Sequence, residues 1–526
     1  MQTLDIGIDA PSSQVIPGES LIIRLSETPK RYYWHGWQSW SLAYWADSAR
    51  FIPPGKPYIL HPLQIDPVYA THPRPHGSWV GAVELADGRI ILLGALGTDA
   101  HVELNGGLKG TYDGQPGEWL VAVGDERAVF ADYARELAAR LGSKTARPAP
   151  RVWCSWYSLY ESIDERELLN VLRHMGDLPF DVVQVDDGWQ RRVGDWEPNR
   201  KFPSGMQTMQ ERIRATDRHA GIWLAPLVAV RSSRLFHDHP DWFLRDERGH
   251  LVSAGLNWGE PVHALDTTHP LVTQYLKDLI QKMRAWGYRY LKLDFLYAGA
   301  LPGLRRENIP REQAYRHALH VMRDAMGDDA YFLACGAPII PTLGLCDALR
   351  IGPDVAGNWE SHRDAVLLHN PAIPGARNSL RTTMNRLWLK DIVQIDPDVA
   401  YFSASGSDLT LEQRDLLKAL ALICGFKATS DLPVWLTDSE REQLRQFLKD
   451  SPRIARTGRL AFSIGGHQLD FSDAIDLPSD PAGWSALQSR VLGWVANQAW
   501  ALQIDLMLGR RAARRKVRKV SAANGI

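Results

Sequence analysis

The sequence predicts a multidomain protein with an N-terminal β-sandwich, a central (β/α)8 TIM barrel and a short C-terminal segment. The chain has 526 residues, and a barrel of this type uses about 250 residues by itself. Short alternating segments separated by Gly, Pro and Asp dominate the first part, whereas strands alternate with amphipathic helices further on. We therefore divide the chain into residues 1–145, 146–453 and 454–526.

The N-terminal part is predicted to be a β-sandwich because its apolar residues alternate with polar ones. Three examples are "SLIIRLSE" at 20–27, "SWVGAVELA" at 78–86 and "RIILLGAL" at 89–96. Alternation over such short runs is typical of strands with one buried face. The segment "GSKTARPAPR" at 142–151 combines Gly, Ser and two prolines, which indicates a linker.

The central part alternates between candidate strands and helical patterns, which predicts a parallel sheet. An open doubly wound sheet is the structural alternative, but no Gly-rich phosphate loop follows its first strand. Helical periodicity is clearest at 164–176, 269–287, 311–327 and 412–425. The eight expected strands are "RVWCSWYS", "FDVVQVDD", "AGIWLAPL", "RYLKLDFL", "AYFLACG", "ALRIGPD", a weaker one near "IVQID", and "FKATSD".

The last part combines a short β-like piece, an apolar helical pattern and a basic tail. The β-like piece is "RLAFSIGGHQLDFSD" at 459–473, and the helical pattern covers 484–508. Seven of the ten residues from 510 to 519 are basic. For so local a run in a neutral protein we expect a solvated tail and not a nucleic-acid contact.

Charge and cysteine content narrow the class of partners and the compartment. Lys and Arg, 60 together, nearly cancel Asp and Glu, 61 together, so we expect neither a nucleic acid nor a membrane as partner, but a neutral small molecule. The start of the chain has no leader pattern, and no run of about 18 apolar residues occurs. The cysteines are scattered, which favours a reducing cytoplasm over a disulfide framework; they are Cys154, Cys335, Cys346 and Cys424. The oligomeric state is not predicted.

The run "YRYLKLDFLYAG" at 288–299 places two charges, Lys292 and Asp294, in an apolar setting. If the run is a strand, these two side chains share one face and the leucines the other. A lone buried carboxylate costs several kcal/mol, about 3 to 5, unless it is paired. The pair is therefore either structural or a catalytic carboxylate with a cationic neighbour.

Polar residues recur where the predicted barrel strands end, the place where barrels carry their chemistry. Widely spaced aspartates without a histidine cluster suit carboxylate chemistry better than a metal site, so we expect no metal and no cofactor. His317, His320 and His362 fall on predicted helices or loops. The strand-end residues are Trp156, Tyr157, Asp186, Asp187, Trp223, Lys292, Asp294, Cys335, Arg350 and Asp354.

Two carboxylates on either side of one bond are what glycoside hydrolysis requires. Asp294 has a cationic neighbour that favours the ionised form needed by a nucleophile. Asp354 follows "RIGP" in a loop, where desolvation would raise its pKa and suit it to acid/base work. On these residues alone the two roles are interchangeable, and ion pairs with Lys292 or Arg350 are the structural alternative.

Several motifs in order resemble glycoside hydrolase family 36, the bacterial α-galactosidases or melibiases. They are "GWQSWS", "RVWCSWYS", "VDDGW", "GDW", "GIWLAP", "HPDW", "YLKLDFLYAGALPG", "ACGAP" and "LRIGPD", and the resemblance covers about residues 32 to 436. Members of that family usually close with an antiparallel β domain, whereas residues 480–526 are predicted to be a helix and a basic tail. Each motif is weak alone, but their order is specific.

The resemblance implies a role for each site residue. Asp294 matches the family's nucleophile and Asp354 its acid/base, while Asp186 and Asp187 match the pair that contacts the galactose 4- and 6-hydroxyls. The remaining residues match sugar contacts or pocket walls. They are Trp40, lent by the N-terminal domain, Trp156, Tyr157, Trp223, Lys292, Cys335 and Arg350.

By this resemblance the expected activity is a retaining, exo-acting α-galactosidase that releases terminal α-linked galactose from oligosaccharides such as melibiose and raffinose. An α-N-acetylgalactosaminidase would use the same carboxylates with a roomier pocket at carbon 2. A non-catalytic galactoside-binding barrel is the alternative from another class, and a metal-dependent barrel enzyme ranks below both.

Overall fold

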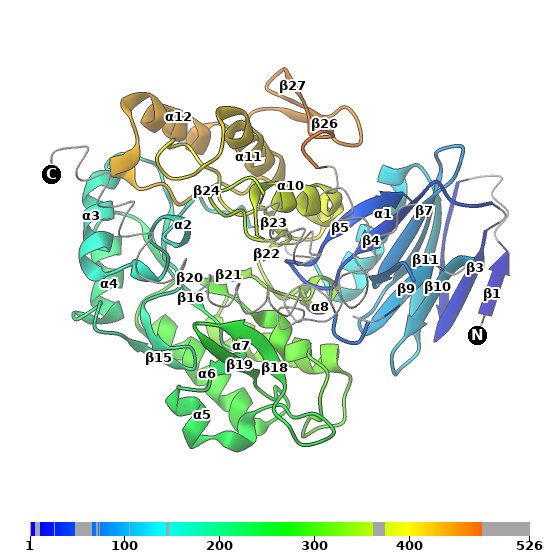
Figure 1. Cartoon of the computed structure of the whole chain (residues 1–526), viewed down its shortest axis with the longest axis horizontal. Helices are drawn as coiled ribbons and strands as arrows, with labels where there is room; N and C mark the ends of the chain where they lie inside the picture. The colour runs from blue at the N-terminus through cyan, green and yellow to red at the C-terminus, as the bar shows by residue number, and fades with distance from the viewer. Residues whose placement is uncertain are drawn as a thin grey trace, which may run out of the picture.

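The computed structural model describes residues 2–5, 11–25, 27–47, 66–69, 72, 74–104, 106–143, 147–360 and 374–475. Two antiparallel-rich sheets form the N-terminal part, and a curled parallel sheet surrounded by helices forms the larger part beside it (Figure 1). Among the described residues, no helix is both long and apolar enough to cross a membrane.

The N-terminal part contains the two sheets that the alternating segments predicted. Every residue of β7 (Val80–Glu84) and β8 (Ile90–Ala95) is buried, which means that both faces of these strands are covered. Helix α1 (Glu126–Leu141), which the sequence analysis did not predict, covers one face: a Cβ on Gly94 would lie 2.4 Å from the Tyr133 ring. One sheet has the order β1 (Gln2–Asp5), β3 (Ser20–Arg24), β10 (Gly107–Tyr112), β9 (Ala100–Leu104), β6 (His76–Ser78), and the other β2 (Ser12–Gly18), β11 (Gly117–Gly124), β8 (Ile90–Ala95), β7 (Val80–Glu84), β4 (Arg31–His35), β5 (Ala43–Asp47).

The parallel sheet has eight strands that pair in chain order, and each lies within or beside a predicted segment. The sheet order begins with β23 and ends with β24, which pairs with the first strand of this sheet in the chain, β12. In the segment after β23, the Ala400 N–H donates to the carbonyl of Ala428 in β24 at 2.9 Å. Chain-order pairing is the arrangement expected of a (β/α)8 unit. The strands are β12 (Val152–Cys154), β13 (Val182–Val185), β16 (His219–Leu224), β20 (Tyr290–Leu293), β21 (Tyr331–Ala334), β22 (Ala348–Arg350), β23 (Gln394–Asp396) and β24 (Ala428–Thr429).

The helices between these strands follow the predicted apolar periodicity. In α3, Leu168, Val171, Leu172 and Met175 are buried at spacings of three and four, and the Asp164 side chain caps the first turn. Helices α11 and α12 each begin with a capping box. The longer helices are α3 (Glu165–Met175), α4 (Gly205–Arg214), α6 (Pro270–Ala285), α7 (Arg311–Met326), α10 (Ala376–Asn385), α11 (Leu411–Cys424) and α12 (Asp438–Lys449).

Small sheets that the sequence analysis did not predict interrupt the alternation. A hairpin, β14 (Gln190–Arg192) with β15 (Asp195–Pro198), follows β13. A three-stranded sheet of β17 (Val228–Val230), β19 (Glu260–Ala264) and β18 (Ser253–Asn257) follows β16. The predicted β-like piece near the C-terminus forms β25 (Ile454–Arg456), β26 (Ala461–Ile464) and β27 (His467–Asp470). The predicted helix and basic tail lie outside the described residues.

The segment that follows β4 joins the sandwich to the parallel sheet. The Ser39 N–H donates to the Ala337 carbonyl at 3.0 Å, and the Ala337 N–H donates to Ser39 Oγ at 3.1 Å. The buried Arg386 guanidinium donates to the carbonyls of Ser39 and Gly36 at 3.0 and 2.9 Å. Because these bonds hold Ser39, its neighbour Trp40 is fixed next to the segment that follows β21.

A buried carboxyl group, Glu312 of α7, forms a second link between the two parts. Its Oε2 accepts hydrogen bonds from Trp79 Nε1 at 2.9 Å and from the Asp99 N–H. Burial and the neighbouring Asp99 raise the pKa of Glu312 to about 8, with Arg311 opposing them. Its side chain therefore carries a proton over much of the neutral range.

We expect Glu312→Ala to destabilise the protein, because it leaves the Trp79 and Asp99 N–H groups buried without an acceptor. Each unsatisfied donor costs about 1 to 3 kcal/mol. Urea unfolding measures the loss, and Glu312→Gln is the matched control because its amide oxygen still accepts. Equal stability of the two variants would contradict this account of the interface.

Candidate active site

Asp294 lies just beyond β20, at the carboxyl end of the parallel sheet. Its Oδ2 accepts a hydrogen bond from Trp223 Nε1 at 3.0 Å, and its Oδ1 accepts from the Phe295 N–H at 2.8 Å. Phe295 has a φ of +55°, so the chain turns sharply after the carboxylate. A Cβ on Gly336 would lie 3.1 Å from Asp294 Oδ1. The carboxylate is therefore held in one orientation by neighbours on three segments.

Lys292 and Trp223 lie within their strands, not after them. Trp223 was expected beyond the third strand, but it is the last residue but one of β16, where it pairs in register with Lys292. Neighbours in register point to the same face of a sheet. Both side chains therefore point to the face that carries Asp294, as the alternation in the 288–299 run predicted.

The ion-pair partner of Lys292 is Asp186, not Asp294 as the structural alternative expected. Lys292 Nζ lies 2.9 Å from Asp186 Oδ2, and both side chains are buried. Asp186 Oδ2 also accepts from Gln184 Nε2 and from Cys154 Sγ, the latter at 3.4 Å. Burial alone would lower the pKa of Lys292, but Asp186 outweighs it and the net pKa is raised. Lys292 is therefore a fixed cation.

Arg350, at the end of β22, contacts three carboxylates. Its Nε lies 2.8 Å from Asp396 Oδ2, its Nη2 2.9 Å from Asp398 Oδ1, and its Nη1 3.3 Å from Asp354 Oδ1. The predicted ion pair between Arg350 and Asp354 is thus present. Asp396 and Asp398 were not predicted, although the strand-end rule applied to "IVQID" points to Asp396.

Asp354 differs from Asp294 in its surroundings. Its side chain is 31% exposed, so solvent reaches it, whereas Asp294 is buried. The rest of the Asp354 side chain is buried, and this burial together with the negative charge of Asp398 raises the pKa of Asp354 to about 7. The positive charge of Arg350 opposes the increase. A carboxyl with a pKa near neutrality can both donate and accept a proton in one cycle.

Asp187 has two side-chain donors, and the sequence analysis predicted neither of them. Gln190 Nε2 donates to its Oδ1 at 2.6 Å, and Trp258 Nε1 donates to its Oδ2 at 2.7 Å. Burial raises the pKa of Asp187 to about 6, and these two donors oppose it. Trp258 lies in the turn between β18 and β19 with a φ of +53°, and nothing in the local sequence relates it to Asp187.

The resemblance implies that Asp187 binds galactose hydroxyls, and on that expectation Trp258→Phe should weaken galactose binding most strongly below about pH 7. The variant keeps an aromatic ring but removes a donor that favours the Asp187 carboxylate, so the pKa of Asp187 rises further above 6. Inhibition constants for galactose between pH 5 and 8 measure the effect. Parallel pH profiles of variant and wild type would refute it.

Aromatic and thiol side chains surround these groups. Trp40 lies edge-on to Phe295 with ring centres 5.3 Å apart, and Trp156 lies edge-on to Tyr160 at 5.1 Å. The Tyr157 hydroxyl donates to Asp398 Oδ2. Burial raises the pKa of the Cys335 thiol, which keeps it neutral. The structure therefore brings the predicted residues of several strand ends, and Trp40 from the sandwich, into one region.

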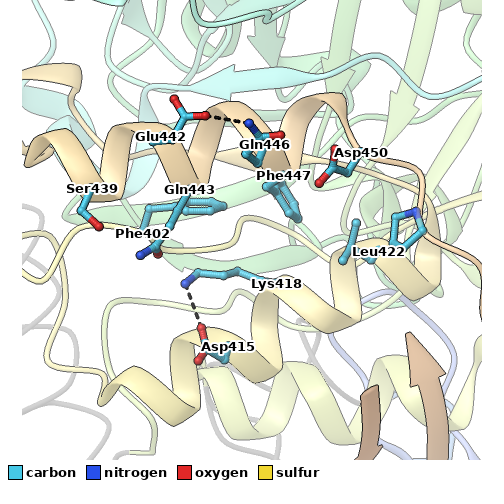
Figure 2. Close-up of a pocket in the computed structure, with 11 residues that line it drawn as sticks. Phe402, Asp415, Lys418, Leu422, Ser439, Glu442, Gln443, Gln446, Phe447 and Asp450 are labelled. Carbon is cyan, nitrogen blue, oxygen red and sulfur yellow. Dashed lines mark hydrogen bonds and ion pairs between the residues drawn. The ribbon is translucent and has the colours of Figure 1, made fainter. Parts of the chain in front are cut away.

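A hollow of about 630 Å³ lies elsewhere, between α11 and α12 (Figure 2). Its lining includes Phe402, Lys418 and Phe447, and none of the predicted site residues. Within the described part of the chain, no group of three His, Cys, Asp or Glu residues could hold a metal ion. The four cysteines are buried free thiols.

Two separately held aspartates at the strand ends of a parallel eight-stranded sheet are the kind of groups that a carboxylate glycosidase uses. The melibiase family model matches residues 122–324. The α-galactosidase TtGalA of Thermus thermophilus, in complex with p-nitrophenyl α-D-galactopyranoside, is 44% identical with a TM-score of 0.84, over 89% of this chain and 96% of that one. The chain therefore belongs to the melibiase family, glycoside hydrolase family 36.

Two further comparisons agree with this assignment. TtGalA in complex with stachyose is 46% identical, with a TM-score of 0.79, over 82% of this chain and 93% of that one. The α-galactosidase AgaA of Geobacillus stearothermophilus is 27% identical over 197 residues, which are 35% of this chain and 26% of AgaA. The matched part therefore spans about a quarter of the length of that curated relative.

Proposed function

We propose that this protein is a retaining, exo-acting α-galactosidase that works by double displacement through a glycosyl-aspartate. The observation that carries the proposal is the contrast between two carboxyl groups of one site. Asp294 is buried and held by the Trp223 and Phe295 N–H groups, whereas Asp354 reaches solvent and has a pKa raised to about 7. The first environment suits a nucleophile and the second an acid/base.

In the first step, an Asp294 oxygen attacks the anomeric carbon while the glycosidic C–O bond breaks. The electron pair of that bond goes to the leaving oxygen, which takes the proton of Asp354. In the second step, the Asp354 carboxylate takes a proton from water as the water oxygen attacks the anomeric carbon and releases Asp294. Two inversions retain the α configuration.

Galactose selection is assigned to Asp187 with Lys292. Asp187 is a buried acceptor, and a sugar whose 4-hydroxyl points elsewhere would leave it unpaired at a cost of about 1 to 3 kcal/mol. TtGalA has been captured with stachyose and with an aryl α-galactoside, which supports α-galactosides as the substrates here. Melibiose and raffinose are the natural sugars to test.

Rates on four aryl glycosides test the proposal: α-galactoside, α-N-acetylgalactosaminide, α-glucoside and β-galactoside. We expect hydrolysis of the α-galactoside alone. Preference for the N-acetylated sugar would instead assign an α-N-acetylgalactosaminidase. Galactose binding without turnover of any of the four would favour a binding protein, and loss of activity in chelator would favour a metal-dependent enzyme.

A further inference from the structure

A carboxylate outside the predicted set, Asp398, contacts the loop that carries Asp354. Its Oδ2 accepts a hydrogen bond from the Val355 N–H at 3.0 Å, one residue after Asp354. The same oxygen accepts from the Tyr157 hydroxyl, and Oδ1 lies 2.9 Å from Arg350 Nη2. One carboxylate therefore joins the end of β22, the loop after it and the short helix after β12.

The backbone at Asp398 is held in an unusual conformation. Its φ is +79°, a region that costs a residue other than glycine about 1 to 3 kcal/mol. The Asp398 N–H donates to Asp396 Oδ1 at 2.8 Å, and the side chain is 1% exposed. A strained, buried carboxylate of this kind persists only when its surroundings fix it.

We propose that Asp398 is a positioning residue for the acid/base Asp354: it fixes the 354–355 backbone and supplies a negative charge beside it. This inference rests on the proposed role of Asp354. Arg350 is shared between the two aspartates, so Asp398 also limits how much of the arginine's charge acts on Asp354. Without Asp398, the positive charge of Arg350 would be shared only between Asp354 and Asp396.

The other groups that face Asp354 lie on or just after five strands of the parallel sheet. Arg350 on β22 and Lys292 on β20 lower its pKa, whereas Asp294 beside β20 raises it. Tyr157 and Tyr160 after β12, Tyr401 after β23 and the Cys335 thiol after β21 are neutral neighbours whose own pKa values are raised by burial. Asp398 is therefore the main anionic neighbour of Asp354. Removing its negative charge should lower the pKa of Asp354.

The test is the pH profile of Asp398→Asn, whose amide oxygen can still accept from Val355 while the charge is lost. For an oligosaccharide whose leaving group needs protonation, kcat/KM falls above the pKa of Asp354. We expect this basic limb near pH 7 in the wild type and at least about one unit lower in the variant. Asp398→Ala, which also releases Val355, should lower kcat on the same substrate further.

Asp396→Asn is the matched control. It removes an equal charge from Arg350, but Asp396 contacts Arg350 at Nε, whereas Asp398 contacts Nη2 and also accepts from the Val355 N–H next to Asp354. We therefore expect a smaller shift of the limb than in Asp398→Asn. An unshifted limb in Asp398→Asn, or an equal shift in both variants, would overturn the proposal. If the wild type itself has no basic limb on oligosaccharides, the acid/base role of Asp354 fails, which is a separate result.

Discussion

Asp294→Asn is expected to reduce kcat on every α-galactoside by about 10⁴-fold or more, because the amide cannot form the glycosyl-enzyme. Removal of a catalytic nucleophile elsewhere costs about 10⁶-fold. The substitution leaves the size of the side chain unchanged, and its oxygen can still accept from Trp223 or Phe295, the donors seen in the structure. Galactose binding, measured by calorimetry, should therefore stay within a few-fold of wild type.

Asp294→Gly provides the complementary result, since it opens space beside Gly336 for an external nucleophile. With azide and an aryl α-galactoside, we expect slow formation of β-galactosyl azide by a single inversion. Activity near wild type in either variant would remove Asp294 as the nucleophile. Formation of the α-azide would mean that another residue still forms a covalent intermediate.

The second large effect is expected for Asp354→Ala, and it should depend on the leaving group. An oligosaccharide needs protonation of its departing oxygen, so we expect kcat/KM to fall by about 10² to 10⁴-fold. A nitrophenolate leaves without a proton, and the first step on that substrate should be little affected. Rates on melibiose and on a nitrophenyl α-galactoside measure the difference.

Azide again distinguishes the roles of the two carboxylates. In Asp354→Ala, azide should intercept the glycosyl-enzyme and give α-galactosyl azide, with faster turnover of the nitrophenyl substrate. Equal losses on both substrates, without azide rescue, would contradict the acid/base assignment. Because sequence reasoning alone left the two aspartates interchangeable, this pair of experiments decides between them.

The strand pattern of the central part could be predicted because each strand is a short apolar run bounded by turn residues. Even the weak segment "IVQID" forms β23 (Gln394–Asp396). The helix α1 was missed because it follows a long series of strand patterns. The sheet of β17, β19 and β18 was missed because its strands are short and irregular, with a register shift between Ser253 and Leu256.

The site could be predicted in outline because parallel strands present their carboxyl ends on one side. That rule places Asp186, Asp294 and Arg350 together, but it does not say which charges pair. Lys292 pairs with Asp186, 106 residues away in sequence, and Trp258 reaches Asp187 from an inserted turn. Such contacts depend on long-range packing, so they become visible only in the folded chain.

The central claim is that two displacements occur through Asp294, and the first-formed product tests it most directly. Proton NMR of freshly mixed enzyme and aryl α-galactoside shows which anomer appears before mutarotation. Initial release of α-galactose is the result we predict. Initial release of β-galactose would mean a single inversion and would contradict the glycosyl-aspartate mechanism.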